Sequence, residues 1–254
     1  MASLIDLPSV PAAEVSAGVQ RSVLVDAARC GSTEFVAELF RISPRAELRL
    51  DVPSGSDRYL FVLSGSARLR GHALDVLLVP RTFASLAEGE KFGLAGSGSA
   101  EAQLLSVTAP PGGSGRTIQG STKGTIVSDI SRLPVVDEPG SKKRRIYLAT
   151  LDTTGTKRAH GMIVFYEGET ITPVHSHPDA ESLFVFLDHP ALVFVNDREI
   201  RVEGGQAVFW GLGEDHGLRS ATALGLSFLE FHIPGVYGVV RRPQPAATSK
   251  EIVP

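Results

Sequence analysis

Short apolar runs broken by Gly and Pro are the feature that most limits how this 254-residue chain can fold. Runs rich in Val, Leu and Phe recur along it, among them 59–63, 74–79, 161–166 and 226–232, and most are separated by some of the 26 glycines and 16 prolines. No stretch keeps the roughly 3.6-residue period of an amphipathic helix for more than about two turns. The pattern predicts many short strands joined by tight turns, and therefore an all-β fold.

Length and charge exclude several classes of function. The chain is long enough for one large domain or for two of ordinary size. Its net charge of −3 provides no basic field for nucleic acid. No apolar run approaches the roughly 18 residues of a membrane helix, and the first residues lack the features of a signal peptide. The single cysteine, Cys30, fits a reducing compartment. We therefore expect a cytoplasmic protein without nucleic-acid or membrane partners.

Three histidines and one glutamate have the spacing of metal ligands. His175 and His177 alternate with Ser176, so on an extended chain their side chains point to the same face. Glu181 has the same parity and follows a Pro-Asp bend that could return it to that face, whereas His216 must come from another strand. Three imidazoles and one carboxylate would form a mixed site of the kind that divalent transition metals favour.

The glycines around these residues complete two motifs. The first segment reads Gly168-Glu-Thr-Ile-Thr-Pro-Val-His175-x-His177-x3-Glu181, and the second reads Gly205-x5-Gly211-x-Gly213-x2-His216. Together they resemble the two motifs of the cupin superfamily, G(x)5HxH(x)3-4E(x)6G and G(x)5PxG(x)2H(x)3N. The chain departs from them by one extra residue after Gly168 and by Asp188, Gly211 and Ser220 in place of Gly, Pro and Asn. The resemblance implies that His175, His177, Glu181 and His216 are the metal ligands.

The resemblance also implies two tandem double-stranded β-helix (jelly-roll) barrels. We expect an N-terminal arm over 1–20, a degenerate cupin barrel without metal over 21–115, a linker over 116–140, a metal-binding cupin barrel over 141–240 and a tail over 241–254. The two halves look like a repeat, because 56–63 is similar to 179–186. Superposing these segments places non-ligand residues at the four ligand positions of the first half: Val52, Ser54, Arg58 and Ser85.

Further polar and aromatic residues are candidates for catalysis or substrate binding. Glu230 and His232 share one face of a late strand; facing the cavity they could act as acid and base, and facing solvent they would be ordinary surface residues. The candidate substrate-binding residues are Arg158, His160, Tyr166, Phe184 and Trp210. The basic run 142–145 is interpreted as a solvated turn or, alternatively, as a clamp for an anionic substrate or partner.

The function predicted from the resemblance is that of a metal-dependent cupin enzyme, an Fe(II)-type dioxygenase acting on a small organic substrate. One alternative is a non-redox isomerase, lyase or hydrolase similar to the ureidoglycine aminohydrolases, and the other is a small-molecule-binding cupin without turnover. We expect one divalent transition metal per chain, with Fe(II) favoured and Mn, Ni, Co, Cu or Zn also compatible with the ligands. The resemblance further implies a homodimer.

Overall fold

The computed structural model describes residues 2–242 and confirms the all-β prediction. In this part of the chain the only α-helix is α1 (Ala27–Cys30), and three 3-10 helices of one turn each are present, η1 (Leu7–Ser9), η2 (Ile130–Arg132) and η3 (Pro139–Ser141). Among these described segments, none is a helix long and apolar enough to cross a membrane. The strands alone therefore determine the architecture.

The N-terminal half consists of two antiparallel sheets that enclose a core. The seven-stranded sheet has the order β12-β9-β6-β11-β4-β3-β2, and the four-stranded sheet has the order β5-β10-β7-β8. The strands are β2 (Ala13–Ser16), β3 (Val19–Val25), β4 (Val36–Ile42), β5 (Glu47–Asp51), β6 (Asp57–Ser64), β7 (Ser66–Gly71), β8 (Leu74–Leu78), β9 (Thr82–Leu86), β10 (Lys91–Ser97), β11 (Ala102–Ala109) and β12 (Ile126–Asp129). Buried side chains from both sheets, such as Leu60 and Leu69, form one apolar cluster between them.

The C-terminal half repeats this arrangement. Its seven-stranded sheet has the order β1-β20-β17-β22-β15-β14-β13, and its five-stranded sheet has the order β19-β18-β21-β16-β23. The strands are β1 (Ser3–Asp6), β13 (Val136–Glu138), β14 (Lys143–Ala149), β15 (His160–Tyr166), β16 (Ile171–Ser176), β17 (Glu181–Phe186), β18 (Ala191–Val195), β19 (Arg198–Val202), β20 (Gln206–Trp210), β21 (His216–Ser220), β22 (Leu226–Ile233) and β23 (Val240–Arg241). Aromatic residues including Phe184, Trp210 and Phe228 fill the space between these two sheets.

The arm and the linker expected from the sequence both contain strands. In the arm, β1 pairs with β20 of the C-terminal half, while β2 pairs with β3 of the N-terminal half. In the expected linker, β12 extends the N-terminal sheet through β9, and β13 extends the C-terminal sheet through β14. Residues 2–20 and 116–140 thus tie the two halves together, because unpaired sheet edges gain hydrogen bonds from them.

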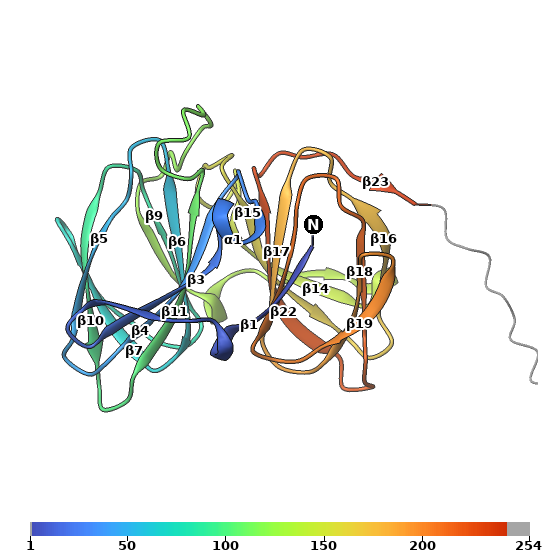
Figure 1. Cartoon of the computed structure of the whole chain (residues 1–254), viewed down its shortest axis with the longest axis horizontal. Coiled ribbons are helices and arrows are strands. Elements are labelled where there is room, and N and C mark those ends of the chain that lie inside the picture. Colours follow the sequence, from blue (N-terminus) through green and yellow to red (C-terminus); the bar gives the residue numbers. More distant parts are fainter. Residues whose placement is uncertain (1, 243–254) are drawn as a thin grey trace, which may run out of the picture.

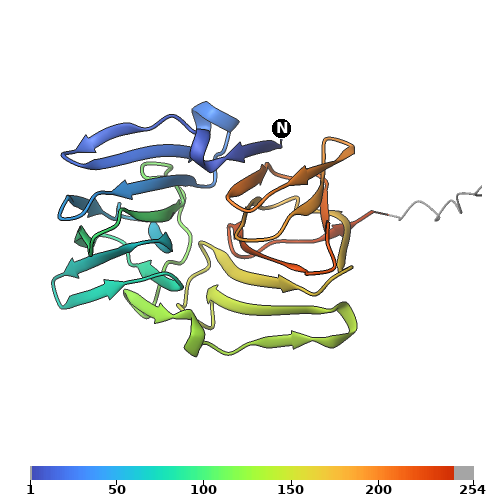
Figure 2. The same cartoon turned by 90° about the horizontal axis from the view of Figure 1, so that it is seen from below.

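The two seven-stranded sheets face each other across a shared apolar interface. Figures 1 and 2 show the halves side by side, with β3 and β6 on one side of the contact and β17 and β22 on the other. The interface cluster contains Tyr59 and Phe61 from β6 together with Leu183 from β17 and Phe231 from β22. The central strands of these sheets, such as β6, β17 and β22, therefore have two buried faces, one toward the interior of their own half and one toward the other half.

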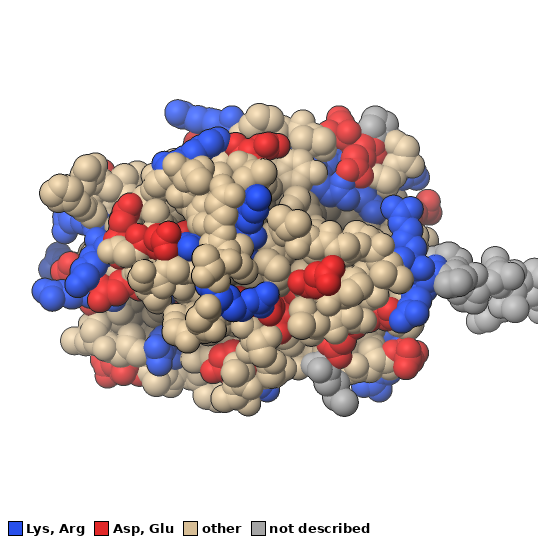
Figure 3. All heavy atoms as spheres, turned by 90° about the horizontal axis from the view of Figure 1, so that it is seen from above, with Lys and Arg blue, Asp and Glu red and all other residues tan. Residues whose placement is uncertain are grey.

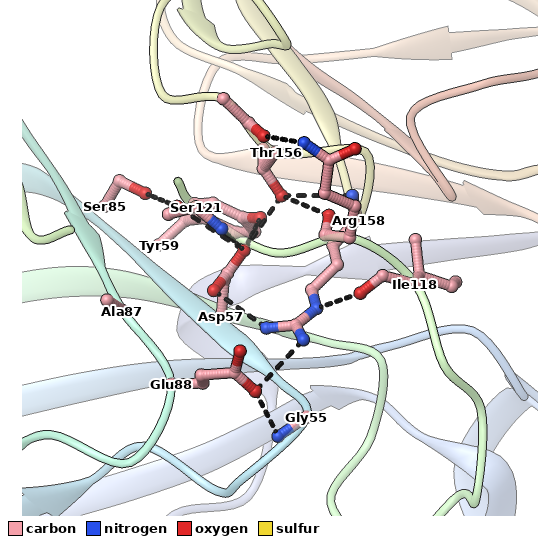
Figure 4. Close-up of polar contacts among 12 residues, drawn as sticks. Gly55, Asp57, Tyr59, Ser85, Ala87, Glu88, Ile118, Ser121, Thr156 and Arg158 are labelled. Carbon is pink, nitrogen blue, oxygen red and sulfur yellow. Dashed lines mark hydrogen bonds and ion pairs between the residues drawn. The ribbon is translucent and has the colours of Figure 1, made fainter. Parts of the chain in front are cut away.

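A buried ionic network crosses this interface (Figure 4). The Arg158 guanidinium, just before β15, donates to the Asp57 carboxylate at 3.0 Å and to Glu88 at 3.1 Å. The Asp57 carboxylate also accepts hydrogen bonds from the Thr156 hydroxyl at 2.8 Å and the Ser121 amide at 3.0 Å. The Asp57 side chain is fully buried and that of Arg158 is 5% exposed, so each charge depends on the other for its stabilisation.

We expect the Arg158→Met substitution to lower the free energy of unfolding by about 3–5 kcal/mol, because it leaves the Asp57 carboxylate buried without its cation. Urea denaturation followed by circular dichroism measures this loss. The matched control is Arg219→Met, which removes an exposed pair with Glu199 and should cost about 1 kcal/mol or less. Equal losses of unfolding free energy in the two variants would contradict the conclusion that Arg158 stabilises the interface between the two halves.

Candidate metal centre

Three histidines meet at one end of the C-terminal half. His175 on β16 pairs directly with His216 at the start of β21, and His177 follows the end of β16. One side-chain nitrogen of each residue lies within 4.8 Å of those of the other two, in a group that could hold a metal ion. We call His175, His177 and His216 the histidine triad. The three rings also contact one another, with centroids 4.4–5.0 Å apart.

The backbone fixes the orientation of all three rings. The Nδ1 atoms of His175, His177 and His216 lie 2.9 Å from the carbonyl oxygens of Pro173, Gly238 and Glu214, respectively. Since a carbonyl can only accept, each Nδ1 carries the proton and each Nε2 keeps a lone pair. This arrangement of outer hydrogen bonds is typical of metal-binding histidines.

The free nitrogens fit a cation. The Nε2 atoms of His177 and His216 are buried without a hydrogen-bond partner among the described residues, and such orphan atoms are costly unless a ligand satisfies them. Burial lowers the pKa of His177 to about 4 and that of His216 well below its usual range, which keeps both imidazoles neutral. Neutral imidazoles with inward lone pairs are the form that binds transition metals.

A glycine turn joins the two motif segments. The amide of Gly213 donates to the carbonyl oxygen of His177 at 2.9 Å, three residues before His216. Gly213 has a φ of 70°, a left-handed conformation that glycine adopts without steric cost. The turn therefore holds His216 beside His177.

The prediction of Glu181 as a fourth ligand is corrected by the structure. Its carboxylate faces the N-terminal half, where it accepts hydrogen bonds from the Ser32 hydroxyl at 2.6 Å, the Thr33 amide at 3.0 Å and the Glu34 amide at 3.3 Å. The side chain is 2% exposed and lies outside the group that could bind metal. Glu181 therefore connects the two halves.

Strand alternation explains this position. Along β17, Leu183 and Val185 belong to the interface cluster, whereas Phe184 belongs to the interior of the C-terminal half. Glu181 lies two residues before Leu183 and so faces the same side. The bend after His177 carries the chain from the five-stranded sheet to the seven-stranded sheet, so the parity of the histidines does not extend to Glu181. The interior position at this end of β17 is taken by Ser182, whose hydroxyl lies 2.9 Å from His232 Nδ1.

A cavity of about 500 Å³ opens beside the histidine triad. Five of the predicted site residues line it together with His175 and His177, namely His160, Tyr166, Phe184, Glu230 and His232. The strand pairing explains this grouping, because His160 lies opposite His232 between β15 and β22. Glu230 and His232 thus face the cavity and not the solvent, which were the two interpretations of their shared strand face.

Glu230 and His232 form a hydrogen-bonded pair in the cavity wall. A carboxylate oxygen of Glu230 lies 2.5 Å from His232 Nε2, and Ser182 is bonded to the other ring nitrogen. Burial raises the pKa of Glu230 and lowers that of His232 well below its usual range. Burial therefore disfavours the charged form of both groups, and the pair can share one proton next to the triad.

Two predicted substrate-binding residues lie elsewhere. Arg158 does not line the cavity, because its guanidinium is committed to Asp57 and Glu88 at the interface. Trp210 is 1% exposed and lies behind the cavity wall, where its ring is 5.0 Å from Phe184 and 5.1 Å from His216. It supports the triad by packing and does not reach the cavity.

Several cavity residues were not predicted from the sequence. Tyr237, in the segment after β22, contacts His177 edge-on and His232 at a tilt, with ring centroids 4.6 and 4.5 Å away. No motif marks it, since it lies beyond the last apolar run. Lys143 and Arg145 also line the cavity. In the sequence both belong to the basic run 142–145. Their position in the cavity wall favours the interpretation of this run as a clamp for an anion over that as a solvated turn.

The equivalent positions of the N-terminal half contain apolar residues. Matching the paired strands places Leu50 at the position of His175, Val52 at that of His177 and Phe92 at that of His216. All three are less than 5% exposed and belong to the N-terminal apolar cluster. The superposition from sequence was therefore wrong in register for Val52, Ser54, Arg58 and Ser85, because Asp57 and not Arg58 lies at the position of Glu181. Its result, an absence of ligands, is unchanged.

A larger cavity, of about 900 Å³, lies between the arm and the two halves. Among the described residues it is lined by 7–12 and by apolar side chains such as Phe61 and Phe186, with Arg41 and Arg81 as its charged groups. It contains no His, Asp or Glu, so the smaller cavity beside the triad is the better candidate for chemistry.

Solved structures share this fold. Protein Ylba from E. coli is similar with a TM-score of 0.77 and 12% identity over 92% of this chain and 91% of that one. Oxalate decarboxylase from Lactobacillus farciminis in a formate complex has a TM-score of 0.71 and 12% identity over 94% and 88% of the two chains. A mutant of the Bacillus subtilis oxalate decarboxylase has a TM-score of 0.70 and 13% identity over 94% of this chain and 78% of that one.

These similarities support the cupin-type fold that the motifs predicted, and at such low identity they show the fold alone. The sequence matches no protein-family model and no curated protein.

We expect Glu181→Gln to lower the free energy of unfolding by about 1–3 kcal/mol, because hydrogen bonds to a charged acceptor are replaced by weaker neutral ones. Urea denaturation measures the loss. Glu203→Gln, at an exposed carboxylate paired with Arg201, is the control and should change stability by less than about 0.5 kcal/mol. A Glu181 variant as stable as the control would argue against its connecting role.

Proposed function

We propose that this chain is a metal-dependent enzyme of the cupin type that acts on a small organic substrate in the cavity beside the histidine triad. The observation that carries the proposal is the convergence of the three imidazoles, each with its Nδ1 on a carbonyl oxygen and its Nε2 toward the others. A structural metal site would instead be closed and usually rich in cysteine.

A divalent transition metal would supply Lewis acidity at this site, with His175, His177 and His216 as its protein ligands. Three neutral imidazoles leave the charge of the ion uncompensated and, in octahedral geometry, leave three positions open. The ligand set accepts Fe(II), Mn, Ni, Co, Cu or Zn. The B. subtilis oxalate decarboxylase that shares the fold has Mn(II) centres, which makes Mn(II) a candidate equal to the Fe(II) favoured by the sequence.

The Glu230–His232 pair supports a proton-transfer reaction. Glu230 lines the cavity and contacts His232 at 2.5 Å, so it can take a proton from a substrate or return one while His232 and Ser182 accommodate the change. This favours the non-redox alternative, an isomerase, lyase or hydrolase, over a cupin that only binds its ligand. Burial raises the pKa of Tyr166 above its usual range, so its hydroxyl remains a neutral hydrogen-bond donor in the wall.

The Fe(II)-type dioxygenase remains the second candidate. Its support is the small number of protein ligands, since a redox-active ion held by His175, His177 and His216 alone would stay more accessible to a substrate and to dioxygen than an ion with a fourth protein ligand. The triad without Glu181 therefore suits this chemistry as well as the proposed four-ligand site did.

We further propose that the chain is a bicupin with one metal site. The support is the repeated order of the sheets and the apolar residues Leu50, Val52 and Phe92 at the positions of the triad. Arg58, on the β6 strand that corresponds to β17, occupies the interior with its ion-pair partner Glu38 at 3.9 Å. A homodimer and a cytoplasmic location stay parts of the proposal that rest on the resemblance and composition alone.

We expect the purified chain to bind about one transition-metal ion and the His177→Ala variant to bind none, because two imidazoles rarely retain such an ion. Elemental analysis of protein made without a metal-binding tag measures the stoichiometry. His189→Ala, at an exposed turn, is the matched control and should bind as much metal as the unchanged chain. Two ions per chain would contradict the metal-free N-terminal half.

We expect the Mn(II)-loaded chain to convert its substrate without oxygen, and Glu230→Gln to slow this turnover by about 100-fold or more while metal binding stays intact. Proton NMR of a library of small organic compounds under nitrogen detects the conversion. Conversion that occurs only with Fe(II) and consumes dioxygen in proportion would overturn the non-redox reaction and establish the second candidate.

A further inference from the structure

Lys143 is a buried cation without an anionic partner. Its side chain lies in the wall of the triad cavity, the residue is 9% exposed, and its ammonium donates to the Thr172 hydroxyl at 2.6 Å. Among residues 2–242 no carboxylate lies within ion-pair distance of it, although most buried charges in proteins are paired. Burial lowers the pKa of Lys143, and the charge of Glu230, which lies beyond ion-pair distance, offsets this only in part.

The alternation of β14 brings this cation inside. Lys143, Arg145 and Tyr147 line the cavity. Ile146 and Leu148, which have the opposite parity, belong to the interface with the other half. The next basic residue, Arg144, is exposed and lies over the Phe165 ring. The basic run is thus divided by the strand period into cavity and surface residues.

Three of the four other charged residues in the cavity lining are already engaged. Arg145 pairs with Glu138, and Glu230 is bonded to His232. Arg241 of β23 adds a further cation to the lining. On a face of the molecule shown in Figure 3, acidic and basic side chains are interspersed, which contrasts with the uncompensated positive charge in this wall.

We propose that the cavity binds a small organic acid whose carboxylate pairs with the Lys143 ammonium while the rest of the molecule extends toward the histidine triad. Such an anion would offset the desolvation of the ammonium and would complete its hydrogen bonds beyond Thr172. The inference rests on the proposed function for its chemistry, but the pairing itself needs only Lys143 and can be tested with and without metal.

The volume limits the size of this acid. A cavity of about 500 Å³ lies within the range of pockets for small molecules, and its aromatic lining, Phe184 and Tyr237 among others, suits a short carbon skeleton. The carboxylate at Lys143 would direct the opposite end of the skeleton toward the Glu230–His232 pair. Lys143 is therefore assigned as the residue that selects acids over their neutral analogues.

The test is isothermal titration calorimetry of succinate and of its neutral diamide, succinamide, with metal-free and Mn(II)-loaded chains. We expect succinate to bind both forms at least about tenfold more tightly than succinamide, since a charge-assisted hydrogen bond is lost in the diamide. This comparison uses the unchanged chain, so it does not depend on how a variant folds.

Two variants locate the effect. Lys143→Met should weaken succinate binding by about tenfold or more and leave succinamide binding and Mn(II) stoichiometry unchanged. The matched control Lys142→Met removes the same charge from the exposed neighbouring residue and should retain succinate binding. Equal affinities for succinate and succinamide, or equal losses in the two variants, would overturn the proposal and would favour an uncharged Lys143.

The titrations distinguish a failure of the acid site from a failure of the proposed metal-dependent function. Succinate selectivity in the metal-free chain together with an absence of metal binding would uphold the acid site and refute the metal enzyme. Normal Mn(II) stoichiometry without succinate selectivity would refute the acid site alone.

Discussion

The two buried faces of the central strands in the seven-stranded sheets determine where most polar groups around the site lie. A side chain on β15, β17 or β22 points either into the interior of its own half or toward the other half, and adjacent residues take opposite sides. On these strands a polar residue is buried on either side and must find partners there. The Glu230–His232 pair lies on the cavity side, next to the histidine triad of the five-stranded sheet, whereas Glu181 and, from the other half, Asp57 lie on the interface side.

The two interface carboxylates have equivalent places in the two halves. Asp57 begins β6 and binds the segment before β15, while Glu181 begins β17 and binds the segment before β4. In each case a hydroxyl, Thr156 or Ser32, donates to the carboxylate across the interface. This repeated contact explains why a glutamate stands close to the histidines in the sequence without serving the metal site.

The sequence was sufficient for the all-β fold and for the convergence of three of the four residues predicted as ligands. His175 and His177 were placed correctly because strand alternation applies within β16, and His216 because the second motif fixes its distance from Gly213. Glu181 failed because a bend separates it from the histidines, and parity carries no information across a bend whose length is unknown. Arg158 failed for another reason, since its partner Asp57 is 101 residues away and such pairing leaves no local pattern.

The bond from His177 to Gly238 has a consequence for how the protein matures. The carbonyl that orients this ring belongs to a segment that follows β22 and is anchored by β23, so it is made after nearly all of both halves. A nascent chain on the ribosome would thus contain all three imidazoles before it could hold them in place. If the triad holds a metal ion as proposed, the complete site would form late in biogenesis, after residue 238 has left the ribosome.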